Sequence, residues 1–206
     1  MLTLIHRELR DHFLYVVLIG LVSLGVIAIA ILTAYWGVAI AGLGIGGAAM
    51  ALLLALFAML GVSQMYTDRA HRISALVATL ATTRTRILAA RILTAVVLII
   101  AMLVPLLVTA VAIMHSLQLP LGFFRGTIAG VFVTSVLTCL AGYCVGLLTG
   151  WTSNRALPAI SVLVGTPLVM LLVAVKGFGW AAIGLLSLFI IASLFLVWRR
   201  FTSVAL

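Results

Sequence analysis

Six long apolar runs divide this chain, and they constrain its fold more than any other feature. A helix needs about 20 mostly apolar residues to cross a bilayer, and only helices and closed barrels satisfy their own backbone hydrogen bonds there. The first run continues past Ala28–Ala30 and is too long for the apolar core of a signal peptide. We therefore predict six spanning helices. They cover about 14–35, 38–63, 87–114, 126–150, 157–175 and 179–198.

Charged side chains are too few to cover a soluble surface. Of 206 residues, 12 are Lys or Arg and 3 are Asp or Glu, which is 7%, whereas a typical soluble domain has about 25%. This composition argues against most soluble enzymes and nucleic-acid-binding proteins, and we expect no nucleic-acid partner. The expected class is an all-α membrane protein, with residues 1–206 forming a single transmembrane domain in contact with lipid.

The basic residues predict an orientation. With six spans both termini lie on one side, and ten of the 12 basic residues fall on that side. The other side holds Arg125 and Lys176. Because Lys and Arg collect in cytoplasmic loops, we expect both termini in the cytoplasm. The ten are Arg7, Arg10, Arg69, Arg72, Arg84, Arg86, Arg91, Arg155, Arg199 and Arg200.

The first 13 residues have the pattern of an amphipathic helix. Apolar residues recur at spacings of 3, 4 and 4, and charged residues occupy the opposite face. Such a helix lies in the membrane surface and runs into the first span. The alternative is an ordinary charged cytoplasmic start. The apolar stripe consists of Leu2, Ile5, Leu9 and Phe13.

The longest polar stretch runs from residue 64 to 86, between the second and third spans. It is longer than a simple connection needs to be. One face of the predicted helix is apolar, with Ile73, Leu76, Val77 and Leu80, and the other is basic and rich in threonine. This surface is either a docking site for a cytoplasmic partner or a helix resting on anionic lipid.

The sequence offers no catalytic machinery. No span has Asp, Glu or Lys at its centre, which disfavours ion-coupled transport and intramembrane hydrolysis. The only lysine, Lys176, is not part of a phosphate-binding Gly-Lys-Ser/Thr motif, so any ATP hydrolysis would need another chain. Four histidines and scattered methionines make copper or haem conceivable, but interfacial packing is the simpler interpretation. We expect no catalytic, cofactor or metal site.

Small residues inside the spans are interpreted as packing residues. Cys139 and Cys144 lie five positions apart on one predicted helix and face different ways, so we expect two small buried residues rather than a disulfide. A glycine-rich run would let helices approach closely, within the bundle or between protomers. It comprises Gly42, Gly44, Gly46 and Gly47.

This organisation resembles an ATP-binding-cassette exporter permease of the type-2 class. In that family the first cytoplasmic loop has an acid, apolar positions, an arginine and a basic residue that enters the third span. The matching residues here are Asp68, Leu76, Leu80, Arg84 or Arg86, and Arg91. His71-Arg72 stands where the family commonly has Gly-Thr, and Thr82 or Thr83 where it has Pro. The architectural match covers nearly the whole chain.

The resemblance implies a permease subunit that exports an apolar or amphipathic substrate and pairs with a second permease protomer. A separate cytoplasmic ATPase would bind ATP-Mg, and the loop would be a coupling helix seated on it, in a bacterial inner membrane. Two alternatives remain: a substrate-capture subunit of a vitamin importer, and a non-transporting anchor or assembly factor. The expected coupling residues are Asp68, Arg69, Arg72, Ile73, Leu76, Leu80, Arg84 and Arg86.

Overall fold

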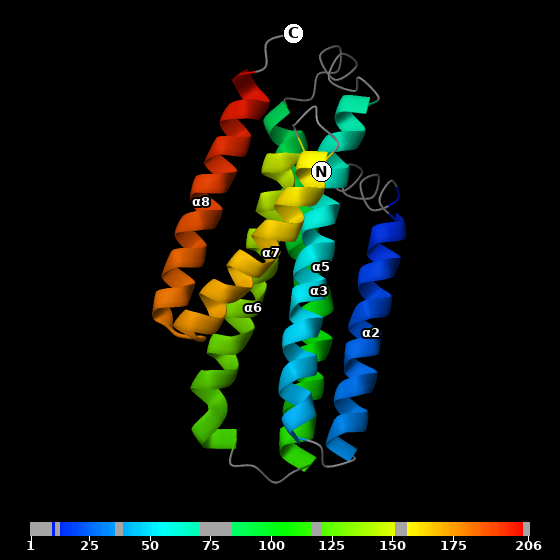
Figure 1. The fold of residues 1–206 in the computed structure, drawn as a ribbon, viewed down its shortest axis with the longest axis vertical. Helices are drawn as coiled ribbons and strands as arrows, with labels where there is room; N and C mark the ends of the chain where they lie inside the picture. Colours follow the sequence, from blue (N-terminus) through cyan, green and yellow to red (C-terminus); the bar gives the residue numbers. More distant parts are fainter. Residues whose placement is uncertain are drawn as a thin grey trace.

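The chain forms a bundle of six long helices (Figure 1). The computed structural model describes residues 10, 13–35, 39–70, 84–116, 121–150 and 156–203. All six helices are long and apolar enough to cross a bilayer, so the chain is an integral membrane protein. The helices are α2 (Phe13–Tyr35), α3 (Ala39–Ala70), α5 (Arg84–Ser116), α6 (Leu121–Thr149), α7 (Ala156–Lys176) and α8 (Trp180–Ser203).

The six predicted spans are confirmed as helices, and all six helices are longer than predicted. Helix α3 ends at Ala70 rather than at residue 63, and α5 begins at Arg84 rather than at 87. The two ends of the predicted polar loop therefore belong to helices. Helix α6 begins at Leu121, one residue after Pro120. Proline lacks the N–H that continues a helix and is common just before or at a helix start.

The closest helix contact joins α3 to α6, which run parallel, through glycines. A Cβ placed on Gly142 would lie 2.9 Å from the Leu54 carbonyl oxygen, and one on Gly150 would lie 2.7 Å from the Met65 Cβ. One on Gly146 would overlap the Ala58 carbonyl oxygen. Only glycine allows the two backbones to approach this far. The spacing of four residues places all three glycines on one face of α6.

Of the predicted glycine-rich packing face, the structure tests Gly47 and its packing inside the bundle; packing between protomers stays a prediction. Gly47 has no atom within 4 Å of its Cβ position, so it supports no close contact inside the bundle. The surroundings of Gly42, Gly44 and Gly46 lie outside the described residues. A run of glycines shows that close approach is sterically possible, but the partner helix decides where it happens.

A tight turn joins α7 to α8. Gly177 ends α7 with φ of 68°, and its N–H donates to the Val173 carbonyl oxygen at 2.8 Å. Glycine adopts this left-handed conformation at little cost. The turn packs on α6, where a Cβ on Gly130 would lie 3.0 Å from the Phe178 carbonyl oxygen. The first turns of α6 therefore extend beyond the α7–α8 turn, as Figure 1 shows.

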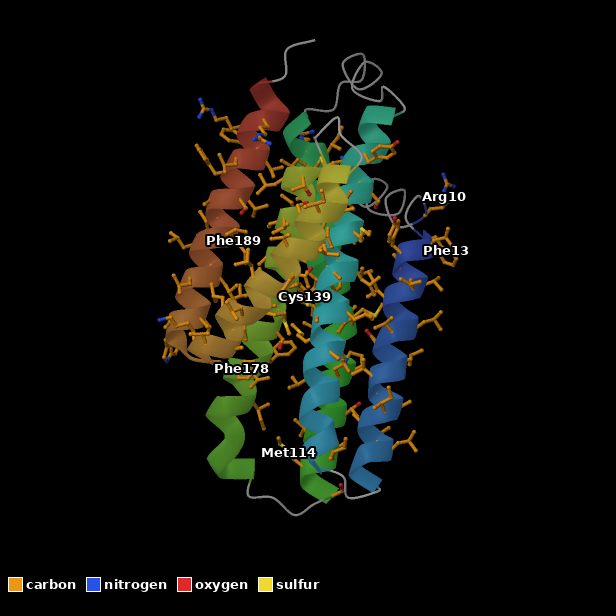
Figure 2. The ribbon with its side chains drawn as sticks, viewed as in Figure 1. Arg10, Phe13, Met114, Cys139, Phe178 and Phe189 are labelled. Carbon is orange, nitrogen blue, oxygen red and sulfur yellow. The ribbon has the colours of Figure 1, made fainter. Side chains whose placement is uncertain are left out.

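The buried side chains form one large and one small cluster on two sides of α6. The large cluster includes Cys139, Tyr143 and Phe57 and takes residues from α2, α3, α5, α6 and α8. The small cluster, with Cys144, takes its buried residues from α6 and α8, and α7 packs against it. Both thiols are free and buried and belong to different clusters, as predicted for small core residues on different helix faces. Figure 2 shows Cys139 in the middle of the bundle.

Candidate functional site

The predicted coupling residues are only partly covered by the described structure. Residues 71–83, which include Arg72, Ile73, Leu76 and Leu80, lie outside it. Asp68 and Arg69 fall in the last turn of α3, and Arg84 in the first turn of α5. Arg86, the third residue of α5, is exposed. The coupling helix itself stays a prediction.

The predicted interfacial helix also lies mostly outside the described residues. This holds for Leu2, Ile5 and Leu9. Phe13 is the first residue of α2, and its side chain is 63% exposed. Arg10 and Phe13 both point away from the bundle in Figure 2. A surface-lying segment before α2 stays a prediction.

Basic residues gather at one end of the bundle, which we call the basic end. The helix directions place the start of α5 and the end of α8 at this end, the upper one in Figure 1. Lys176 lies at the opposite end of α7. The exposed Trp180 follows it, and such aromatic residues favour the membrane interface. The described basic residues at or near the basic end are Arg10, Arg69, Arg84, Arg86, Arg91, Arg199 and Arg200.

Helices α3 and α5, which flank residues 71–83 (the basic loop below), are the longest of the six described helices. Helix α3 has 32 residues and α5 has 33, whereas α7 has 21. At 1.5 Å per residue the first two are about 48–50 Å long, roughly 20 Å more than the hydrocarbon core of a bilayer. Part of each helix therefore lies outside the core, and both bound the same loop.

A buried polar layer crosses the bundle near the basic end, formed by Gln64, Arg91 and Tyr143. The Tyr143 hydroxyl of α6 donates to the Gln64 Oε1 of α3 at 2.6 Å. Both side chains are at most 2% exposed. Thus α3 and α6 are joined by a short hydrogen bond as well as by glycine contacts. In an apolar interior an unpaired amide or hydroxyl is costly, so this pairing stabilises the α3–α6 contact.

Arg91 adds a charge to this polar layer from α5. It is 5% exposed and is engaged in an interaction of its own. Counting along the α5–α6 hairpin from residues 116 and 121 places Arg91 near the level of Gly146, one turn from Tyr143. The sequence places Arg91 at the entry to the third span, whereas its burial follows from the packing of α5 in the bundle. An arginine inside an apolar run is itself a signal of a functional position.

The remaining buried polar groups are single hydroxyls spread over several helices. Thr94 and Thr138 donate within their own helices, to the carbonyl oxygens of Ala90 and Thr134 at 2.8 and 2.7 Å. Within the part of the chain that the structure describes, the buried hydroxyl oxygens of Ser23, Thr134 and Thr166, on three different helices, have no hydrogen-bond partner. Among the described residues, no three His, Cys, Asp or Glu side chains come close enough together to hold a metal ion.

Among the described residues, the hydrogen-bonded buried side chains named above bond within or between helices, and they include no set of groups for covalent catalysis. The polar layer pairs the Gln64 amide with the Tyr143 hydroxyl, and Arg91 lies about one helical turn away along the bundle. The Tyr143–Gln64 hydrogen bond connects α6 to α3, the helix that ends at Ala70. Comparisons with protein-family models, with curated proteins and with solved structures give no match to this chain.

Proposed function

We propose that this chain is the permease subunit of an ATP-driven exporter of an apolar or amphipathic substrate, and that a separate cytoplasmic ATPase docks at the basic end. The observation that carries the proposal is the pair of long helices, α3 and α5, that bound residues 71–83, the central part of the predicted polar stretch 64–86. A partner that moves the loop would move both helices, and α3 is packed tightly on α6 at the centre of the bundle.

The wide apolar surface supports a subunit that works with lipid and with a second protomer. Many large apolar side chains of α2, α5, α7 and α8 are exposed, among them Leu14 at 81% and Leu163 at 76%. The described interior has few polar groups, which suits an apolar cargo and not an ion. In the proposed orientation the basic end faces the cytoplasm of a bacterial inner membrane, together with both termini.

The first test is to isolate the tagged chain in mild detergent and to identify the proteins that accompany it by mass spectrometry. The proposal expects a stoichiometric P-loop ATPase. It is contradicted if the chain is isolated alone even after gentle crosslinking. A small molecule bound to the lone chain would then indicate a capture subunit, and its absence would indicate an anchor or assembly factor.

The second test reverses charges on the loop and on α5. In the variant Arg72→Glu with Arg84→Glu, we expect ATP hydrolysis to lose its coupling to transport while the bundle stays folded, because the arginines would pair with acids of the ATPase. The matched control reverses Arg199 and Arg200, exposed at the same end on α8. Transport-coupled ATPase activity that is unchanged in the first variant, or equally reduced in the control, argues against this docking site.

A further inference from the structure

We infer that the hydrogen bond between Tyr143 and Gln64 fixes the register of α3 against α6, so that the two helices move as one rigid pair. Gln64 and Tyr143 are thus positioning residues. The part of the inference that concerns force transfer rests on the proposed function, because a partner must displace the loop. The part that concerns register does not.

The glycine contact and the hydrogen bond constrain α3 and α6 in different ways. Gly142, Gly146 and Gly150 allow the two backbones to approach closely, through van der Waals contacts that depend on distance. A hydrogen bond is directional. From 2.6 Å, a slide of about 2.5 Å across the bond direction takes the two oxygens past 3.5 Å, so a shift of α3 by one helical turn, about 5.4 Å, breaks the Tyr143–Gln64 bond. Single buried polar contacts define register between packed helices in the same way.

The Tyr143–Gln64 bond lies where it can pass a displacement of α3 on to α6. Gln64 lies six residues before the end of α3, so the bond is about 9 Å from the point where the basic loop begins. On its other side, α6 contributes Ala141 and Cys144 to the small cluster shared with α7 and α8. A displacement of α3 therefore reaches α7 and α8 through α6, provided that α3 and α6 do not slip.

The two native cysteines report separately on the two sides of α6. Cys139 lies in the large cluster with α3, and Cys144 in the small cluster with α8. Both are buried and free, so a maleimide reacts only when the surrounding helices open. Slippage of α3 on α6 would expose Cys139, and transmitted motion would change the reactivity of Cys144.

The first experiment uses the full chain alone in lipid nanodiscs and measures maleimide labelling of each thiol by mass spectrometry. Tyr143→Phe and Gln64→Leu remove the same bond from either side. Interhelical hydrogen bonds in membranes shift conformational equilibria by about 3- to 18-fold, so we expect Cys139 labelling to accelerate by that factor. The double variant should add little to either single change, because both remove one interaction.

The control variant is Thr94→Val, which removes a buried hydroxyl bonded within α5 and should label at the rate of the unmodified chain. Unchanged Cys139 labelling in both Tyr143→Phe and Gln64→Leu would overturn the inference. So would equal acceleration at Cys139 and Cys144, since that indicates general loosening of the bundle.

The second experiment repeats the labelling with the accompanying ATPase. We expect ATP to change Cys144 labelling in the unmodified complex, and this change to shrink in Tyr143→Phe although the ATPase stays bound. A full ATP response in that variant would overturn the force-transfer part. If no ATPase is found, the proposed function fails, and the first experiment still decides whether the bond defines register.

Discussion

Replacing Gly146 by alanine tests the central helix contact of the bundle. The new Cβ would overlap the Ala58 carbonyl oxygen and lie 2.9 Å from the Ala58 carbonyl carbon and 3.0 Å from the Val62 nitrogen. All three atoms belong to the backbone of α3, which cannot rotate aside as a side chain can. We therefore expect Gly146→Ala to force α3 and α6 apart.

The size of the effect follows from the contact distances. Non-bonded heavy atoms are most stable about 3.5–4.0 Å apart, and the overlapping Ala58 oxygen is the closest atom, so the helices must separate by about 1 Å or more. A gap of about 1 Å already loses about half of each attractive contact along the interface. Overpacking in cores costs about 1–3 kcal/mol, and we expect about 2–3 kcal/mol here because the obstruction is backbone.

The assay is unfolding of the purified chain by SDS in mixed micelles, followed by circular dichroism. The matched control is Gly184→Ala on α8, where no atom lies within 4 Å of the added Cβ. Alanine favours a helix over glycine by about 1 kcal/mol, so the control should be neutral or slightly stabilised. If Gly146→Ala unfolds at the same SDS fraction as Gly184→Ala, the close α3–α6 contact is refuted.

Three further predictions concern the α7–α8 turn, the thiols and the orientation. Gly177→Ala should destabilise the chain by about 1 kcal/mol in the same assay, because φ is 68° there, and Gly179→Ala should have a smaller effect; equal effects would contradict the left-handed turn. Cys139 and Cys144 should resist maleimide in mild detergent and react after denaturation in SDS, whereas rapid reaction of the folded chain would contradict their burial. The orientation is tested with single cysteines in a background that lacks both native ones. An impermeant maleimide added outside cells should label Lys176→Cys and not Arg200→Cys. Labelling of both would contradict the orientation.

The six spans were predictable from the sequence because lipid imposes a single requirement on every segment. Each run had to be long and apolar, and backbone groups in the hydrocarbon core had to be satisfied within the segment. Pro120 and Gly177 marked two of the boundaries for local steric reasons. The extra turns of α3 and α6 were not predictable in this way, because they lie where the apolar pattern ends.

The contacts between spans depended on the tertiary structure. In a bilayer the lipid-facing and core-facing sides of a helix are both apolar, so the periodicity that reveals the buried face of a soluble helix is weak. The sequence therefore could not distinguish Gly47, which has open space around it, from Gly146, which touches the α3 backbone. Likewise, the pairing of Gln64 with Tyr143 joins residues 79 positions apart and exists only because α3 and α6 pack side by side.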